Sequence, residues 1–461
     1  MPVSSALAKL LCYIVFSGLS CASVIVTNRS RYAHILSSLN NDYFTHTKQT
    51  GLSITWHCSQ LRRIMFLSVG LIFSSDSWSA DRISPNGVEY AGITLFPELT
   101  VIQGWDNNLL RQTDNGIETF YTLLKPSVDV RAGSGSQQYK LGYRLDTGWY
   151  EASDNDNYLD HFLYGQALWS MDHRNAIGLA LDYAATHEDR GTGVSQGSRA
   201  NDFDDVVEFN ESDIQLNYTL GSDESAGRLR FSLGWLAKDY TNFSSITRQR
   251  DRETFTSRIN FLWRLGRTGI VFVAEHKDIN YTNDPVKTEG QPDRLDSQQL
   301  KLLAGLRWDL TGKTSGNIKL GSVNRNFDDK DREKFSEISW EAEVNWLPVS
   351  YSKFIASFAR TEQESDAEGS FIDSQNVTVR WLHEWSNDLS SKTRFSIIED
   401  DYIDDPNQRK DDRLLAAAEL NYQLNYWLQI GLAATWLDKD STIDGLDFTR
   451  FGSALKLFAQ L

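Results

Sequence analysis

Spans of alternating apolar and polar residues recur along the chain, and this period of two constrains the fold more than any other feature of the sequence. In "RLRFSLGWLAK", Phe231, Leu233 and Trp235 share one parity, whereas Arg228 and Arg230 share the other. Successive side chains of a β-strand point to opposite faces, so each span is predicted to be a strand with one apolar face. Comparable spans of roughly 12–16 residues follow one another from about residue 93 to the C-terminus, whereas strands of globular proteins are typically about 5–6 residues long.

The connections between these spans alternate in length. Short turns such as 132–137 and 265–269 alternate with long acidic loops such as 187–205, 362–373 and 399–412. Eight short turns and about nine long loops predict about eighteen strands, with sixteen as the alternative count. An even number of antiparallel strands, with short turns at one end and long loops at the other, is typical of outer-membrane barrels. We therefore expect an all-β chain that folds as a transmembrane antiparallel β-barrel over residues 93–461.

The composition favours such a barrel over a soluble β-sandwich or propeller. Mean hydropathy is negative although the strands are long, as expected when only one face of each strand meets lipid. The other face carries full charges, which suit a water-filled lumen. Tryptophans fall near the ends of the spans, where the aromatic girdles of a barrel lie. They are Trp105, Trp149, Trp346, Trp385 and Trp427.

Charged residues on the polar parity are the candidate functional residues. Charges of both signs that face a pore give it ion selectivity. The alternative is that these charges pair with one another and hold the barrel wall. The lumen-lining candidates are Arg144, Arg228, Arg230, Arg258, Arg264, Lys301, Arg307, Asp309, Glu341, Glu343, Arg380 and Glu419, and Asp146 shares their parity.

The first eighty residues differ from the rest and are predicted to be a leader. Arg62 and Arg63 precede an apolar core over 64–73, and small residues end at Ala80. This is the order of charged region, apolar core and cleavage site in a secretory signal peptide. We therefore predict a signal peptide over 61–80.

The sequence before that signal is interpreted as lying outside the mature protein. Translation is then expected to start near residue 61, at Met65 or at an alternative start just before it, which makes residues 1–60 upstream sequence. The alternative is an anchor helix at 10–26. Residues 81–92 are expected to be a short segment before the barrel. The mature chain is predicted to contain no disulfide and no cysteine-ligated metal, because all three cysteines precede the signal; they are Cys12, Cys21 and Cys58.

The mature chain shows no residue spacing typical of a catalytic or metal site. The formal net charge of −16 argues against a nucleic-acid partner. The segments 154–160 and 438–445 resemble calcium loops but lack the closing glutamate, so solvated acidic loops are the simpler interpretation. The segment 247–253, with Arg248, Arg250 and Arg252, is interpreted as an ordinary charged loop, with contact to an anionic sugar or lipid phosphate as the alternative.

The histidines also lack the spacing of metal ligands. We expect His173 and His187 to be solvated polar residues. The other three are His161, His276 and His383. Together these observations predict that the protein is not an enzyme and holds neither a metal nor a cofactor.

Two stretches carry a resemblance to a known family. The stretch 96–111 contains Pro97 and "WDNN", and the stretch 123–193 contains Pro126, "YLDH" and "HEDRG". They resemble the putative β-barrel porin type 2 family of outer-membrane barrels, which are often encoded beside exopolysaccharide or capsule genes. The resemblance implies the outer membrane of a Gram-negative bacterium and a polysaccharide context, and it brings no catalytic residues.

The strand pattern continues to the last residue of the chain. A closed barrel has no free edge, so its last strand is expected to pair with its first along its full length. In "RFGSALKLFAQL" we expect Leu457 to face lipid and Lys456 to face the lumen. The tail also resembles the C-terminal signal that barrel assembly machinery recognises, with Phe458 and Leu461 as the assembly-signal residues.

These observations predict an outer-membrane channel. Its expected role is export of exopolysaccharide or capsular polysaccharide, or porin-like diffusion of small solutes. The expected partners are outer-membrane lipid and lipopolysaccharide, the barrel assembly machinery, and proteins of polysaccharide synthesis or export. Two alternatives stay open: an outer-membrane enzyme that acts on lipid or glycan, and a non-conducting surface-binding or scaffold barrel plugged by its own loops.

Overall fold

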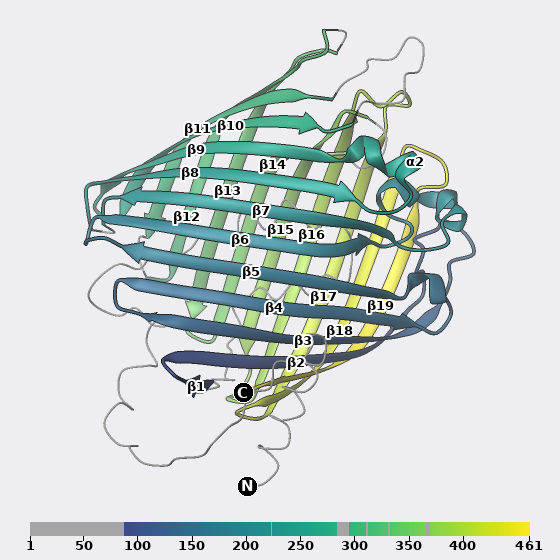
Figure 1. Cartoon of the computed structure of the whole chain (residues 1–461), viewed down its shortest axis with the longest axis horizontal. Coiled ribbons are helices and arrows are strands. Elements are labelled where there is room, and N and C mark those ends of the chain that lie inside the picture. The colour runs from purple at the N-terminus through teal and green to yellow at the C-terminus, as the bar shows by residue number, and fades with distance from the viewer. Residues whose placement is uncertain (1–86, 223, 284–294, 310–311, 331, 366–368) are drawn as a thin grey trace.

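Each long strand pairs with the strand that follows it in sequence, and the last pairs with the first (Figure 1). The computed structural model describes residues 87–222, 224–283, 295–309, 312–330, 332–365 and 369–461. Within these residues, β2 to β19 form one closed antiparallel β-barrel of eighteen strands, and the short β1 pairs with the start of β2. The predicted fold class and strand number are confirmed. The predicted leader over 1–80 lies outside the described residues.

The barrel strands are 13 to 16 residues long, in agreement with the predicted spans. Their bounds are β1 Val88–Tyr90, β2 Ile93–Asp106, β3 Thr119–Ser134, β4 Gln137–Tyr150, β5 Tyr158–Ser170, β6 Asn175–Glu188, β7 Val207–Leu220, β8 Gly227–Tyr240, β9 Arg252–Leu265, β10 Thr268–Tyr281, β11 Ser297–Asp309, β12 Thr314–Phe327, β13 Phe335–Val349, β14 Ser352–Glu364, β15 Phe371–Glu384, β16 Leu389–Ile403, β17 Lys410–Asn425, β18 Leu428–Ser441 and β19 Phe448–Gln460.

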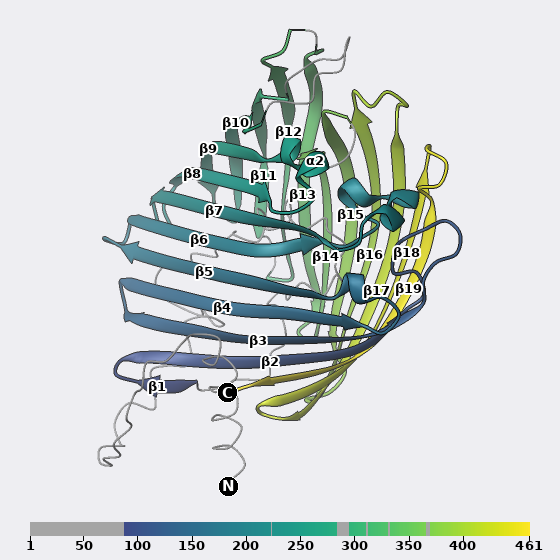
Figure 2. The same ribbon diagram turned by 45° about the vertical axis from the view of Figure 1, so that its right-hand side comes forward.

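Short turns and long loops gather at opposite ends of the barrel (Figures 1 and 2). The connection from β9 to β10 has two residues, and its Gly266 has a φ of +66°. Glycine adopts this left-handed conformation without strain, and tight hairpins require it. The other end carries the helices α2 Ser244–Thr247, η2 Asp154–Asp156, η3 Gly193–Ser195, η4 Gly197–Asp202 and η5 Arg248–Arg250. In barrels of this kind the short turns face the periplasm and the long loops face outward.

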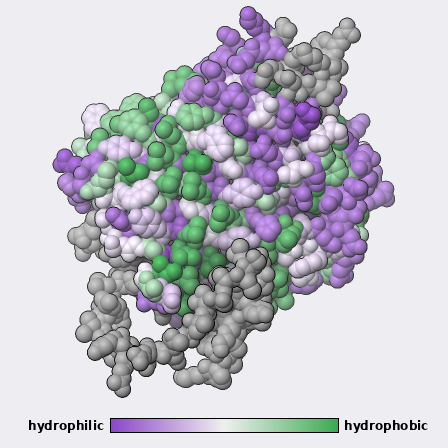
Figure 3. Space-filling model, in the orientation of Figure 1, coloured by the Kyte–Doolittle hydropathy of each residue, from purple (hydrophilic) through white to green (hydrophobic). Residues whose placement is uncertain are grey.

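The two faces of each strand have opposite character. On the outer face of β8, Phe231 and Leu233 are 40% and 46% exposed. Leu306 and Leu432 are the corresponding outward residues on other strands and are about 60% exposed. Figure 3 shows hydrophobic side chains over the middle of the strands and hydrophilic ones over the long-loop end. This apolar outer band is the surface that a bilayer covers.

Tryptophans stand at both ends of this band. Trp149 lies at the long-loop end of β4, and Trp346 and Trp385 lie near short turns. These three side chains are exposed on the outer surface. Trp105 packs against Phe451 across the closing seam, with ring centroids 6.2 Å apart. The arrangement matches that of interfacial aromatic girdles.

The C-terminal strand closes the barrel. β19 pairs with β2 from Gly452–Asp106 to Gln460–Glu98. The backbone N–H of Leu461 donates to the carbonyl of Pro97 at 3.2 Å, so the pairing reaches the last residue. The predicted pairing of the last strand with the first is confirmed. The role of Phe458 as part of an assembly signal stays a prediction.

The junction between β13 and β14 is incomplete. Its paired residues end at Glu341–Ala359, although β13 continues back to Phe335 and β14 continues to Glu364. The β14–β15 ladder does not stop there and continues to the pair Glu364–Phe371. The long-loop part of this pair of strands therefore has no backbone ladder to β13, although the Arg360 side chain still donates to the Ile338 carbonyl at 3.1 Å. We call residues 360–365 and 369–375 the inner hairpin.

Candidate functional site: the barrel lumen

The predicted lumen-lining residues lie on the strand face opposite the exposed apolar side chains. Residues directly opposite each other in a ladder lie on the same face, and Lys319 is opposite Glu341, as Ile355 is opposite Arg380. Their part in ion selectivity stays a prediction. Arg144 lies on β4, Arg228 and Arg230 on β8, Arg258 and Arg264 on β9, Lys301, Arg307 and Asp309 on β11, Glu341 and Glu343 on β13, Arg380 on β15, and Glu419 on β17.

Several of these residues meet in one ion-pair cluster inside the barrel. Arg258 lies 3.3 Å from the Glu275 carboxylate and 3.8 Å from that of Glu341. Glu341 also accepts a hydrogen bond from Lys319. The Arg258–Glu341 pair joins β9 to β13, which are not neighbours in the barrel. The cluster therefore links inner-wall positions that the sequence keeps far apart.

Other predicted residues form smaller pairs. The Arg144 guanidinium lies 3.0 Å from the Asp146 carboxylate. Glu419 lies 3.7 Å from Lys456 of the closing strand. In contrast, Arg380 stands directly opposite Arg394 of β16 in the ladder. Some of these charges therefore pair within the wall, and others stand beside a like charge.

The loop between β6 and β7 folds across the lumen, and we call residues 189–206 the inner loop. At its tip the Gln196 Oε1 accepts a hydrogen bond of 2.5 Å from Arg409, in the loop between β16 and β17. A Cβ added to Gly197 would lie 2.7 Å from the Leu446 side chain, in the loop between β18 and β19. The inner loop therefore reaches loops on the far side of the barrel.

Buried charges fix the base of the inner loop. Arg111 donates to the Asp189 carboxylate at 2.7 Å and to the carbonyl of Arg190 at 3.1 Å. Arg190 in turn donates to Asp156 at 3.0 Å. Burial alone would raise the pKa of Asp189, but the charges of Arg111 and His187 outweigh it and lower that pKa overall. The Asp189 carboxylate is therefore charged at physiological pH.

The inner hairpin is anchored to the inner wall by buried ion pairs. Glu362 lies 2.7 Å from the Lys301 ammonium of β11. Glu364 accepts two hydrogen bonds from Arg325 of β12, at 2.8 and 2.9 Å. Tyr281 of β10 donates to the same carboxylate at 2.7 Å. The Arg325 side chain is fully buried, so this bidentate pair is shielded from solvent.

Aromatic packing completes the attachment of the inner hairpin. Phe371 is fully buried. Its ring lies 4.9 Å from that of Phe335 and 6.2 Å from that of Phe327, measured between centroids. The Arg325 guanidinium lies 4.6 Å from the centre of the Phe371 ring. Residues of β14 and β15 thus cover the inner face of β10 to β13, which narrows the lumen at its long-loop end.

A cavity lies beside these two inward-folded segments. Its volume is about 280 Å³, and side chains of the inner wall, the inner loop and the inner hairpin line it. Charges of both signs face it, among them Glu211, Lys238, Arg258, Glu275 and Arg413. Apolar side chains share the wall with these charges, among them Trp235, Leu437 and Phe448.

Two features differ from the sequence predictions. His187 is not solvated, since its side chain is buried and its ring nitrogens contact Asp160 at 2.8 Å and Asp189 at 3.3 Å. The predicted acidic loops at 362–373 and 399–412 are shorter than expected, because the strands on both sides of each continue into them. The reason is that strands extend beyond the apolar band, where polar residues on both faces hide the alternation.

Charged side chains of the calcium-like and arginine-rich segments bind other parts of the protein. In the calcium-like segment 154–160, Asp156 binds Arg190 and Asp160 binds His187. In the arginine-rich segment, Arg250 donates to the carbonyl of Ser365 at 3.1 Å. In the part of the chain that the structure describes, no group of three or more His, Cys, Asp or Glu side chains is placed to hold a metal. No helix among those residues is long and apolar enough to cross a membrane.

The sequence did not single out the anchors of the inner segments. The alternation in "NIKLGSVNRNF" could have predicted that Arg325 faces the barrel interior, because Arg325 has the inward parity of β12. Glu364 belongs to a stretch that reads as an acidic loop. Arg111 and Asp189 lie in loops 78 positions apart, and no periodicity connects them.

Comparison with known proteins agrees with this architecture. A family model described as "Putative beta-barrel porin 2" matches residues 81–461, well beyond the stretches that carry the resemblance in sequence. No curated protein matches the chain.

Solved outer-membrane proteins are similar at low sequence identity. OpdK of Pseudomonas aeruginosa, solved with vanillate, is 10% identical with a TM-score of 0.48, over 80% of this chain and 99% of OpdK. The FrpB iron transporter of Neisseria meningitidis is 10% identical with a TM-score of 0.44, over 75% of this chain. The match covers 62% of the FrpB chain. OccAB3 of Acinetobacter baumannii is 11% identical with a TM-score of 0.42, over 80% and 99% of the two chains.

Proposed function

Since the chain belongs to the putative beta-barrel porin 2 family, we propose that it is a channel for hydrophilic solutes in the outer membrane of a Gram-negative bacterium. The observation that carries the proposal is a cavity lined by charges of both signs inside a closed barrel with an apolar outer band. Charged walls lower the cost of bringing a hydrated solute into the barrel. The inner loop and the inner hairpin restrict the long-loop end, so we propose that their movement controls the flow.

Export of a glycan is the second candidate function. The observation that favours it is the incomplete β13–β14 junction, because release of the inner hairpin would widen the lumen for a chain-like substrate. On this proposal the partners are proteins of polysaccharide synthesis or export at the periplasmic mouth, with lipopolysaccharide around the barrel and the assembly machinery acting during insertion.

Two other classes of function, a plugged scaffold barrel and an enzyme, predict different experimental results. A plugged scaffold barrel would pass no solute under any condition. An enzyme that acts on lipid or glycan would need a reactive group, and the buried His187–Asp160 pair is the arrangement closest to one. Loss of hydrolysis in a His187→Ala variant would support the enzyme, whereas we expect no hydrolysis by the unchanged protein.

Liposome swelling tests the proposed function. Vesicles containing the purified chain are diluted into isotonic arabinose, maltose or raffinose, and turbidity is followed. We expect swelling rates that fall as the sugar becomes larger, because the inner segments narrow the lumen. Rates equal to those of protein-free vesicles for all three sugars would refute solute passage.

A further inference from the structure

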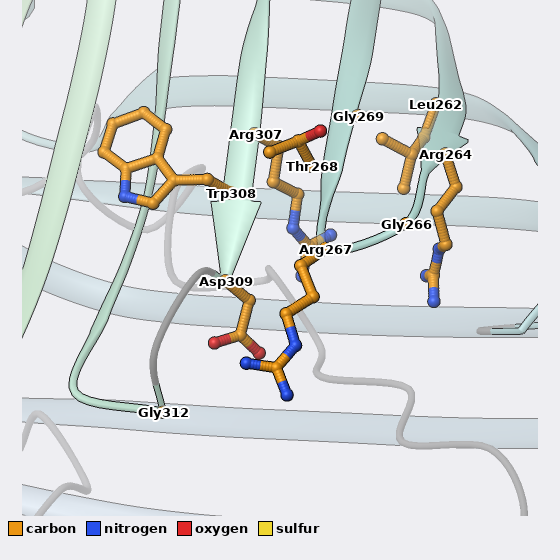
Figure 4. Close-up of a pocket in the computed structure, with 10 residues that line it drawn as sticks. All are labelled: Leu262, Arg264, Gly266, Arg267, Thr268, Gly269, Arg307, Trp308, Asp309 and Gly312. Carbon is orange, nitrogen blue, oxygen red and sulfur yellow. The ribbon is translucent and has the colours of Figure 1, made fainter.

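The short-turn end of β9, β10 and β11 holds a pocket of about 440 Å³ (Figure 4). Figure 4 shows Arg264, Arg267 and Arg307 projecting into the same space as Asp309. Three guanidinium groups and one carboxylate give these four side chains a formal charge of +2. Short turns of such barrels face the periplasm, so this positive pocket lies at the periplasmic mouth.

The position of Gly269 shapes the pocket. In the ladders Gly269 is directly opposite Arg264 on one side and Arg307 on the other. Neighbouring strands are about 4.8 Å apart, so the two arginine backbones are separated by about 10 Å. A Cβ at position 269 would lie 2.7 Å from the Leu262 side chain and 3.0 Å from the carbonyl of Trp263. A glycine there keeps the space between the two arginines open.

The adjacent strand extends the positive surface. Arg228 and Arg230 of β8 are paired with Leu262 and Asn260 of β9, on the same inner face as Arg264. Guanidinium groups bind carboxylate and other oxyanions through two parallel hydrogen bonds. The short-turn end therefore differs from the cavity at the long-loop end, where acidic and basic side chains alternate.

We propose that this pocket is a binding site for the carboxylate of an acidic saccharide that enters the barrel from the periplasm. The inference rests on the proposed channel function and adds the substrate class to it. Arg264 and Arg307 hold the carboxylate from two sides, and Arg267 in the turn contacts the solute as it approaches. A neutral sugar of the same size lacks the group that these residues bind.

The test uses the purified full chain in planar bilayers, with ionic current as the readout. Oligogalacturonate is the acidic probe, and a maltooligosaccharide of equal length is the neutral one. We expect oligogalacturonate to reduce the current when added on the short-turn side, and the neutral oligosaccharide to have little effect. In an Arg264→Gln/Arg307→Gln variant the concentration for half block should rise roughly tenfold or more, because two charge-assisted contacts are lost.

Arg174→Gln, in the exposed short turn between β5 and β6, is the matched control and should block like the unchanged protein. Arg307→Lys keeps the charge but not the forked geometry, so an intermediate effect is expected. Inorganic phosphate as a third probe separates recognition of any oxyanion from recognition of an acidic sugar. Equal block by phosphate at the same concentration, or unchanged block in the double variant, would overturn the proposal.

Failure of the channel itself is a separate outcome. If the unchanged protein conducts no ions, the proposed function fails, and binding of oligogalacturonate to the detergent-solubilised protein is measured by calorimetry. Oligogalacturonate binding that is present in the unchanged protein and lost in the Arg264→Gln/Arg307→Gln variant supports the proposed site. Absence of binding in the unchanged protein overturns it.

Discussion

Removal of the Glu364 carboxylate should release the inner hairpin. Arg325 is fully buried and its guanidinium donates two hydrogen bonds to Glu364. A Glu364→Ala change leaves that guanidinium buried without this partner as long as the hairpin stays in place. Breaking a buried ion pair in this way costs about 3–5 kcal/mol. Since about 1.4 kcal/mol corresponds to a factor of ten, the equilibrium should shift toward the released hairpin roughly 140- to 3700-fold.

Single-channel recording measures this shift. We expect the Glu364→Ala protein to spend a larger share of time in a state of higher conductance than the unchanged protein. Glu118→Ala, which removes an exposed carboxylate in the loop between β2 and β3, is the control and should not change the recordings. A double variant, Arg325→Met/Glu364→Met, replaces both charges with apolar groups and should restore closure. Identical conductance histograms for the Glu364→Ala and unchanged proteins would refute the assignment of the hairpin as a gate.

Three further predictions concern the closing seam, the inner loop and the outer face. Deletion of residues 458–461 removes the last pairs between β19 and β2 and should block assembly; normal amounts of heat-modifiable protein in outer-membrane fractions would contradict this. Gly191→Ala should displace the inner loop, because a Cβ there would lie 2.1 Å from the Leu110 carbonyl and φ is +84°. We expect proteases to cleave the loop faster in the Gly191→Ala protein than in a Gly165→Ala control. In that control the added Cβ meets its nearest neighbour at 3.8 Å. Leu432→Arg on the lipid face should destabilise the barrel by about 2–4 kcal/mol, and Thr256→Arg on the inner face by less; equal urea midpoints for both would contradict the assignment of faces.

The barrel could be predicted from the sequence because strand geometry is local. The parity of Phe231 and Arg230 follows from a period of two alone, and the alternation of short and long connections fixes which strand ends share a side. The same parity placed Arg258 and Glu341 on the inner face, yet it could not show that they meet across non-neighbouring strands. That contact depends on the curvature of the closed sheet.

The inward-folded segments could not be predicted from the sequence for a different reason. The bond between Arg111 and Asp189 depends on how two loops pack, and loop packing leaves no repeat in the sequence. At the inner hairpin, β14 leaves β13 after Ala359, so Glu362 and Glu364 contact the inner wall although their stretch reads as an acidic loop. His187 was expected to be solvated because it borders a loop, but that loop folds back and buries it.

Conductance of the purified full chain in a planar bilayer tests the central claim most directly. The closed barrel with its charged inner wall predicts discrete, long-lived current steps in potassium chloride, with further transitions when the inner segments move. Insertion of the folded protein without any current step, over a range of voltages and salt concentrations, would contradict the account of the protein as a channel.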